Sequence, residues 1–336
     1  MYNTTYHRAG SVEEAAKLAS ANDEAKFVSG GQTLIPAMKS RLAAPSDLID
    51  LRHIASMKGI TISGKSVTIG AATIHYDVAA SKELAAVCHA LCSLASHIGD
   101  PHVRHMGTIG GSISNNDPAA DYPSAMLALG ATIVTNQREL SAEDFFTGLF
   151  ETALEAGEIV TAVKFTAPDK AGYAKFPNPA SRYAMTGVFV AKTGSDVKVA
   201  VTGAGENGVF RASAIEAALN ANFSPDAVDG VSVSADGLMA DMHASADYRA
   251  NLIKVMAKRA VAAAGGGGLA AAVDTVRREV SEAAATLGKE ASDVGAAVRN
   301  AVNEAAGEVR QTADRVLAAV PEKKRGWLAR LFGLGK

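Results

Sequence analysis

A diglycine turn near the N-terminus is the first feature of the sequence that could do chemistry. The run Gly30–Thr33 (Gly-Gly-Gln-Thr) stands between a strand-like segment, residues 25–29, and a helix-like segment, residues 34–41. Glycine lets the backbone turn tightly and approach a ligand closely, and the start of a helix offers free N–H groups. A diphosphate suits such a junction. Diglycine turns are also common as plain structural turns, so this motif alone leaves both interpretations open.

A second diglycine loop carries more polar chemistry than a plain turn needs. Residues 108–121 read Thr-Ile-Gly-Gly-Ser-Ile-Ser-Asn-Asn-Asp-Pro-Ala-Ala-Asp. Hydroxyl and amide N–H groups suit phosphate oxygens, whereas a carboxylate such as Asp121 suits a ribose diol or a ring N–H. Together the two loops predict a site for a ligand that carries a diphosphate.

The sulfur and imidazole side chains do not indicate a metal site. Cys88 and Cys92 are the only cysteines, and two thiolates cannot alone ligate an iron–sulfur cluster or a structural zinc. We expect both to be buried core residues. His97, His102 and His105 gather before the second loop, but their spacing matches no metal-ligand set and packing or surface roles explain them. Any redox centre bound by this chain is therefore predicted to be organic.

The elements that must position the first loop lie in residues 1–55. A helix is expected over residues 11–21, because Ser11 can act as N-cap and Glu14 follows at capping-box spacing. Strand-like segments on both sides of the first loop complete the pattern. This part predicts a small βαβ-like unit.

The elements around the second loop predict two α+β units. Residues 56–170 contain a hairpin pattern over residues 60–70 and a helical pattern over residues 81–98. Residues 171–264 begin with alternating strand segments and end in a long helix over residues 246–264. We therefore expect an α+β fold with several domains.

The chain changes character after four glycines, 265–268, which mark a linker. Apolar residues then recur at three- and four-residue steps over 269–320, which predicts one amphipathic helix of about 50 residues, roughly 75 Å long. Because its apolar stripe is narrow, we expect it to pair with itself or with a partner helix, and a solvated extension is the alternative. Residues 321–336 mix basic and aromatic side chains, including Trp327, as segments that bind an anionic membrane surface do.

The bulk composition describes an ordinary soluble protein. The 336 residues are 48% hydrophobic and carry a net charge of −2, so the chain can bury a large core and gives no indication of nucleic-acid binding. Residues 1–10 are polar, and no apolar run reaches the roughly 20 residues that span a bilayer. We expect a cytoplasmic protein that the tail can bring to the inner face of the cell membrane.

Several motifs, in order along residues 1–264, resemble the FAD-binding medium subunits of the xanthine dehydrogenase and carbon monoxide dehydrogenase family. They are GGQTLIP at 30–36, GDPHVRHMG at 99–107, TIGGS at 108–112, NPASRYA at 178–184 and DMHASADYR at 241–249. The resemblance implies a two-subdomain FAD-binding domain of the vanillyl-alcohol-oxidase type, residues 1–55 and 56–170. A C-terminal α+β domain, residues 171–264, and the long helical extension would follow.

The resemblance also implies which residues touch the cofactor. FAD would lie extended between the two subdomains, with its diphosphate held by both diglycine loops. Tyr183 falls where an aromatic residue covers the flavin ring in close relatives. The implied contact residues are Phe27, Val28, Ser29, Gly30, Gly31, Gln32, Thr33, Leu34, Thr108, Ile109, Gly110, Gly111, Ser112, Asn115, Asp121, Lys175 and Tyr183.

The function implied is that of an electron-transfer subunit of a molybdenum hydroxylase. An iron–sulfur small subunit with 2Fe-2S clusters would reduce the FAD, and an external acceptor such as quinone would oxidise it. A large subunit would hold the molybdenum-pterin cofactor and select the substrate, and relatives form dimers of heterotrimers. The activity we expect first is aerobic carbon monoxide dehydrogenase, with a xanthine- or aldehyde-type hydroxylase as the alternative within the family.

Two further alternatives come from other functional classes. An independent FAD-dependent oxidoreductase would need acid–base groups beside the flavin, and no such cluster stands out in the sequence, so we expect no catalytic side chain in this chain. A membrane scaffold that has lost its flavin is disfavoured by the intact glycines of both loops.

Overall fold

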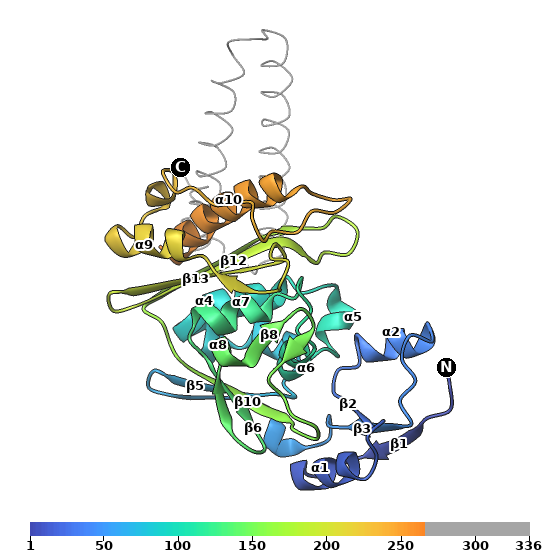
Figure 1. Cartoon of the computed structure of the whole chain (residues 1–336). Coiled ribbons are helices and arrows are strands. Elements are labelled where there is room, and N and C mark those ends of the chain that lie inside the picture. The colour runs from blue at the N-terminus through green and yellow to red at the C-terminus, as the bar shows by residue number, and fades with distance from the viewer. Residues whose placement is uncertain (266–336) are drawn as a thin grey trace, which may run out of the picture. The chain divides into compact units, whose positions relative to one another are not determined.

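The computed structural model describes residues 1–265, drawn in colour in Figure 1. Gly265 is the C-cap of the last described helix, α10 (Ala246–Ala264). The rest of the predicted glycine linker, the predicted helix over 269–320 and the basic aromatic segment 321–336 lie outside the described residues.

The first region is a small parallel sheet with two helices. The sheet has the order β1-β3-β2, with β1 (Thr5–Arg8), β2 (Lys26–Val28) and β3 (Asp47–Asp50) all parallel. The helices are α1 (Val12–Ser20) and α2 (Leu34–Lys39). The sequence pattern predicted both helices and strands β2 and β3, but not β1. The predicted N-cap is confirmed, because the Ser11 hydroxyl accepts a 3.2 Å hydrogen bond from the Glu14 amide.

The second region is built on a five-stranded antiparallel sheet. Its strand order is β4 (Ile60–Ser63), β5 (Ser66–Gly70), β10 (Val160–Thr166), β6 (Thr132–Thr135) and β7 (Glu139–Ser141). The predicted hairpin is β4–β5, and the predicted helix over 81–98 is α4 (Lys82–Ser96), in which Cys88 and Cys92 are buried as expected. The shorter elements are η1 (Ala55–Met57), α3 (His75–Ala80), α5 (Pro101–Arg104), α6 (Ile109–Asn115), α7 (Tyr122–Ala128), α8 (Ala142–Phe145), β8 (Phe146–Gly148) and β9 (Glu151–Thr152).

The third region is a four-stranded antiparallel sheet that is covered on both faces (Figure 1). Its strands, in spatial order, are β11 (Lys170–Pro177), β12 (Ala184–Thr193), β13 (Asp196–Thr202) and β14 (Phe210–Arg211). Helices α10 and α9 (Ser213–Ala221), together with η2 (Pro225–Val228), pack on one face, and α4 and α7 pack on the other. Residues along a strand alternate between the two faces, so Val188 and Val190 of β12 enter the core under α10 while Phe189 enters the core of the second region.

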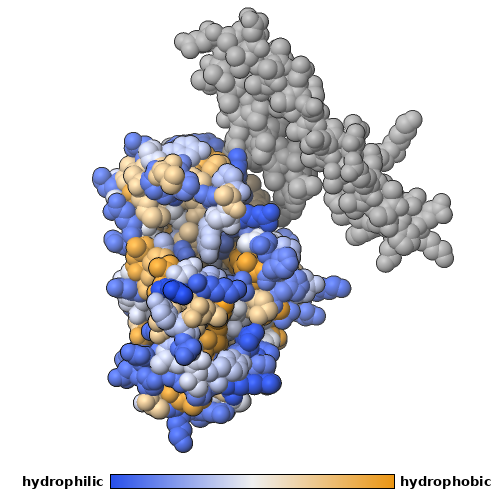
Figure 2. Space-filling view, turned by 90° about the vertical axis from the view of Figure 1, so that its right-hand side faces the viewer, coloured by the Kyte–Doolittle hydropathy of each residue, from blue (hydrophilic) through white to orange (hydrophobic). Residues whose placement is uncertain are grey.

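No described helix is long and apolar enough to cross a membrane. On the face shown in Figure 2, hydrophilic and hydrophobic residues of the described part are interspersed. The α+β class expected from the sequence is confirmed by these three sheets and their covering helices.

Candidate functional site

A cavity of about 490 Å³ lies between the loop after β2 and the second region. Its size falls in the range of about 300–1,000 Å³ that is usual for cofactor sites. The predicted contact residues line it, except Ile109 and Lys175. The lining residues outside the implied contact set are Lys26, Leu51, Met57, Ala71, His75, Ile98, Val103, Gly107, Ser114, Asp117, Ala120, Leu154, Glu158, Ile159 and Val160.

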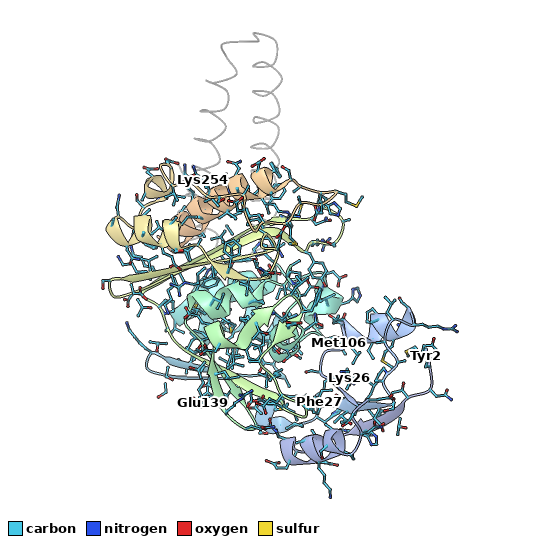
Figure 3. All side chains as sticks on the ribbon, viewed as in Figure 1. Tyr2, Lys26, Phe27, Met106, Glu139 and Lys254 are labelled. Atoms are coloured by element: carbon cyan, nitrogen blue, oxygen red, sulfur yellow. The ribbon has the colours of Figure 1, made fainter. Side chains whose placement is uncertain are left out.

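The two diglycine loops, which are far apart in sequence, meet in the wall of this cavity. A Cβ added at Gly30 would lie 2.4 Å from the Met106 carbonyl oxygen and 2.5 Å from Gly107 Cα, so only glycine allows this approach. Figure 3 shows Met106 close to Lys26 and Phe27 at the junction of the first two regions. The sequence prediction that both loops serve one site agrees with this geometry.

The first loop offers backbone donors to a ligand. Within residues 1–265, the amides from Gly30 to Leu34 donate to no acceptor of the chain. The residues of this loop line the cavity, and Gly31 adopts a φ of +70° that favours glycine. A run of unpaired N–H groups in a tight turn is an anion-binding arrangement, and it suits a diphosphate.

The second loop offers side chains rather than backbone donors, which corrects part of the sequence prediction. The amides of Ile109 and Gly110 donate to the carbonyl oxygens of Thr73 and Ala71 at 3.1 and 2.9 Å, and the Gly111 amide donates to the Thr108 hydroxyl at 3.1 Å. These N–H groups are therefore not available to a phosphate. The groups left to face the cavity are the side chains of Ser112, Ser114 and Asn115.

Ile109 itself does not fit the predicted role. Its side chain is fully buried in the core of the second region, and it is absent from the cavity wall. An apolar residue at the first position of α6 anchors this helix in the core, which leaves the next turn at the cavity.

Lys175 is turned away from the predicted contact and into an ion pair with Asp121. Its Nζ lies 2.9 Å from Asp121 Oδ1 and donates at 2.8 Å to the His97 carbonyl oxygen, and both charged side chains are only 5% exposed. The Tyr173 hydroxyl also donates to Asp121. Burial raises the pKa of Asp121, whereas the charge of Lys175 acts in the opposite direction. This cluster ties β11 to the segment that follows the second loop.

Tyr183 lines the cavity and is partly exposed, so it lies at the rim. Its side chain is 47% exposed, and burial together with the charges of Asp117 and Asp121 raises the pKa of its hydroxyl, so the phenol stays neutral. The preceding turn is fixed by Asn178, whose amide donates at 2.8 Å to the Tyr183 carbonyl oxygen. Arg182, in the same turn, has a φ of +63°.

Three titratable groups in the cavity wall, those of Lys26, His75 and Glu158, were missed because no motif contains them. His75, at the start of α3, is buried, and burial and the charge of Arg104 lower its pKa to about 4. Glu158 accepts hydrogen bonds from Arg138, which lower its pKa to about 2. Neither spacing nor local composition marks these residues as parts of a site.

The residues present fit an FAD. The unpaired amides of Gly30–Leu34 suit the diphosphate, the apolar side chains of Ile98 and Val103 suit a planar ring, and Tyr183 can cover that ring from the rim. Among residues 1–265, no group of three or more side chains could hold a metal ion.

Comparison with known proteins agrees with this assignment. Residues 2–168 match the family model described as the FAD binding domain in molybdopterin dehydrogenase. The carbon monoxide dehydrogenase medium chain of Afipia carboxidovorans is 34% identical over an alignment of 272 positions, which covers 76% of this chain and 94% of that protein. The nicotine 6-hydroxylase medium subunit of Paenarthrobacter nicotinovorans is 32% identical over 77% of this chain and 96% of its own length.

Solved structures show the same fold. Carbon monoxide dehydrogenase from Hydrogenophaga pseudoflava matches with a TM-score of 0.68 and 31% identity, over 79% of this chain and 98% of that chain. Reconstituted CO dehydrogenase from Oligotropha carboxidovorans matches with a TM-score of 0.71 and 31% identity, over 78% and 97%. The expected fold and cofactor are thereby confirmed, and the chain belongs to the family of FAD-binding medium subunits of molybdenum hydroxylases.

Proposed function

We propose that this chain carries electrons from an iron–sulfur subunit to an external acceptor such as quinone. The observation that carries the proposal is the position of Tyr183, which lines the cofactor cavity and is still 47% exposed. A flavin ring covered by this side chain would lie close to the surface of the subunit. A redox partner could therefore exchange electrons with it without entering the cavity.

Three titratable groups of the cavity wall are held or buried, which argues against an independent oxidoreductase. Asp121 is engaged by Tyr173 and Lys175, and Glu158 is held by Arg138. His75 is buried and neutral. An enzyme that removes a proton from its own substrate needs an accessible base with a pKa near the working pH, and these groups do not supply one.

The roles of this chain are then to bind FAD, to orient its ring and to shield the ring from water. The amides of Gly30–Leu34 hold the diphosphate, and Tyr183 limits the access of water to the ring. The ion pair of Asp121 and Lys175 keeps the third region, which carries Tyr183, fixed against the second loop. When bound, FAD supplies the redox chemistry, since it can take up and release electrons singly or in pairs.

The test is rapid reduction of the assembled complex. We expect co-expression with an iron–sulfur and a molybdenum subunit to give a dimer of heterotrimers by mass measurement. After substrate is added, iron–sulfur absorbance should bleach before the flavin band. Flavin reduction at the same rate by this chain alone, without partners, would favour the independent oxidoreductase instead.

Carbon monoxide is the substrate we propose for the complex. The similarity to the carbon monoxide dehydrogenase medium chain of Afipia, at 34% identity, supports this substrate. The medium subunits of glyceraldehyde dehydrogenase and nicotine 6-hydroxylase are almost as similar, at 32% identity each. The substrate is selected on the large subunit, so the assay must use the complex. Flavin reduction by carbon monoxide, and not by aldehydes, purines or N-heterocycles, is the expected result.

Residues 321–336 are proposed to bring the cytoplasmic complex to the membrane, close to quinone. Their basic and aromatic composition supports this, because each basic side chain near anionic headgroups contributes about 1 kcal/mol. Full-length chain should sediment with anionic vesicles at low salt, whereas a chain ending at Gly265 should not. Equal sedimentation of the two chains would exclude membrane binding by residues 321–336. Pairing of residues 269–320 with a partner helix would then remain as the role of this part of the chain.

A further inference from the structure

His75 is a buried imidazole in the cavity wall that has no hydrogen-bond partner. Its side chain is only 4% exposed, and its Nδ1 is sealed from solvent without a partner among the described residues. The backbone of His75 is well fixed, because its amide donates at 2.9 Å to the Gly107 carbonyl oxygen. Buried polar side chains of native proteins are nearly always hydrogen-bonded, so an unpaired one in a ligand cavity indicates a partner on the ligand.

The surroundings of the imidazole define its protonation state. The ring of Tyr122 lies behind it, with 5.3 Å between centroids, and Arg104 contributes a positive charge. Burial and this charge lower the pKa of His75 to about 4, so the ring is neutral at physiological pH. On the other side of the imidazole, the residue at position 107 must be glycine, because a Cβ there would lie 2.6 Å from His75 Nε2.

A neutral imidazole carries one proton, and the surroundings favour its place on Nε2. A buried N–H without an acceptor is rarer in proteins than a buried acceptor without a donor. The sealed Nδ1 is therefore the unprotonated nitrogen. Nε2 also has no partner in the part of the chain that the structure describes, but it is not sealed from solvent. It can donate to a ligand in the cavity.

We propose that His75 binds the flavin portion of FAD, donating a hydrogen bond from Nε2 to a carbonyl oxygen of the ring system. The unpaired amides of Gly30–Leu34 already serve the diphosphate. His75, Ile98 and Val103 all line the cavity, and a Cβ added at Gly107 would meet both the imidazole of His75 and the backbone of Val103. This apolar wall suits the ring and not a charged phosphate. The inference depends on FAD binding by this chain and is independent of the proposed electron donor, acceptor and substrate.

The experiment compares FAD and ADP binding by the full-length apo chain. For His75→Leu we expect FAD affinity to fall about tenfold, which equals about 1.4 kcal/mol, while ADP affinity stays unchanged. His75→Gln keeps a donor and should bind FAD more tightly than the leucine variant. A carbonyl oxygen of the ring gains negative charge on reduction, so a hydrogen bond to it stabilises the reduced flavin more than the oxidised one. The flavin midpoint potential of His75→Leu should therefore become more negative.

Tyr122→Phe is the matched control. It removes a nearby buried hydroxyl that has no hydrogen-bond partner among the described residues, without changing the imidazole. Its FAD affinity and midpoint potential should equal those of the unmodified chain. An equal effect of Tyr122→Phe would mean that His75 acts through Tyr122 and would overturn the proposal.

Two other results would also overturn it. Unchanged FAD affinity in a folded His75→Leu chain would make His75 a core residue, and a parallel loss of ADP affinity would place the contact on the diphosphate. If the leucine variant does not fold, imidazole ¹⁵N spectra of the unmodified chain decide the matter. They should show a proton on Nε2 whose resonance shifts with FAD and not with ADP.

Discussion

The hydroxyl of Thr108 donates a 3.0 Å hydrogen bond to the hydroxyl of Ser29 and so joins two loops that are 79 residues apart in the chain. The same Thr108 oxygen accepts a 3.1 Å hydrogen bond from the Gly111 amide and caps α6. One hydroxyl thus fixes both the start of a helix and the distance between the two halves of the cofactor site.

Thr108→Val should weaken both functions of this hydroxyl. Loss of a threonine N-cap lowers the free energy of unfolding by about 1 kcal/mol. We also expect FAD affinity to fall several-fold, because the two loops are no longer held together. Ser29→Ala is the matched variant, since it removes the contact between the loops and keeps the cap. Urea unfolding and flavin fluorescence titration measure the two effects, and unchanged FAD affinity in both variants would contradict the bracing role.

Gly30→Ala should abolish FAD binding by the full chain. The added methyl group would lie 2.4 Å from the Met106 carbonyl oxygen, so the loops must separate. Gly230→Ala is the control, because a Cβ there meets nothing within 4 Å and Gly230 has no positive φ. The flavin content of the purified proteins is the measurement. Normal flavin content in Gly30→Ala would show that the contact between the loops is dispensable.

Lys175→Met should lower the free energy of unfolding by about 3 kcal/mol near neutral pH, because it leaves the Asp121 carboxylate buried without its cation. Burial raises the pKa of Asp121, and loss of Lys175 raises it further. A folded pKa above the unfolded one means that stability is lost as pH rises through that pKa. The difference from the unmodified chain should therefore be largest at high pH and shrink on acidification.

The double variant Asp121→Asn, Lys175→Met tests this explanation, because it removes both charges. It should be more stable than Lys175→Met alone at neutral pH. Denaturant unfolding at several pH values gives the free energies of unfolding of the unmodified chain, Lys175→Met and the double variant. A pH-independent loss in the single variant would mean that packing of the lysine stem, and not charge, stabilises the cluster.

Glu158 should give the subunit an acid-sensitive component of stability. Hydrogen bonds from Arg138 lower its pKa from 4.5 to about 2. A depressed folded pKa contributes stability that is complete above the ordinary pKa and is lost as pH falls toward 2. Glu158→Gln should flatten this part of the stability curve, whereas Glu139→Gln, at the exposed pair with Lys164, should not. Identical curves for the two variants would contradict the assignment.

The sequence predicted the elements with a clear periodicity or cap. The hairpin β4–β5, the capped helix α1 and the long helix α10 each have a local pattern that tertiary contacts do not override. The loops of the cavity were predicted from glycines and short polar side chains, and the family resemblance supplied Tyr183. Local chemistry thus predicted the two loops, whereas the set of contact residues came from the family resemblance.

Features that depend on pairing or on distant neighbours were not predictable. Strand β1 is polar and mostly exposed, and only its parallel pairing with β3 makes it a strand. Strand β11 contains Gly172 and two lysines, yet it is held between β12 and α10, where a Cβ on Gly172 would collide with the Ala260 carbonyl oxygen. The orientation of Lys175 toward Asp121, and the burial of His75, likewise follow from residues far away in sequence.

The four-stranded sheet has a practical consequence for handling this subunit. Helix α10 covers one face, and α4 and α7, which flank the segment of the second loop, cover the other (Figure 1). The last described residue, Gly265, thus leaves the fold on the side of the sheet away from these two helices. A dye, an affinity tag or a surface tether attached there would keep its distance from the flavin, so the cavity could be titrated on immobilised protein without obstruction.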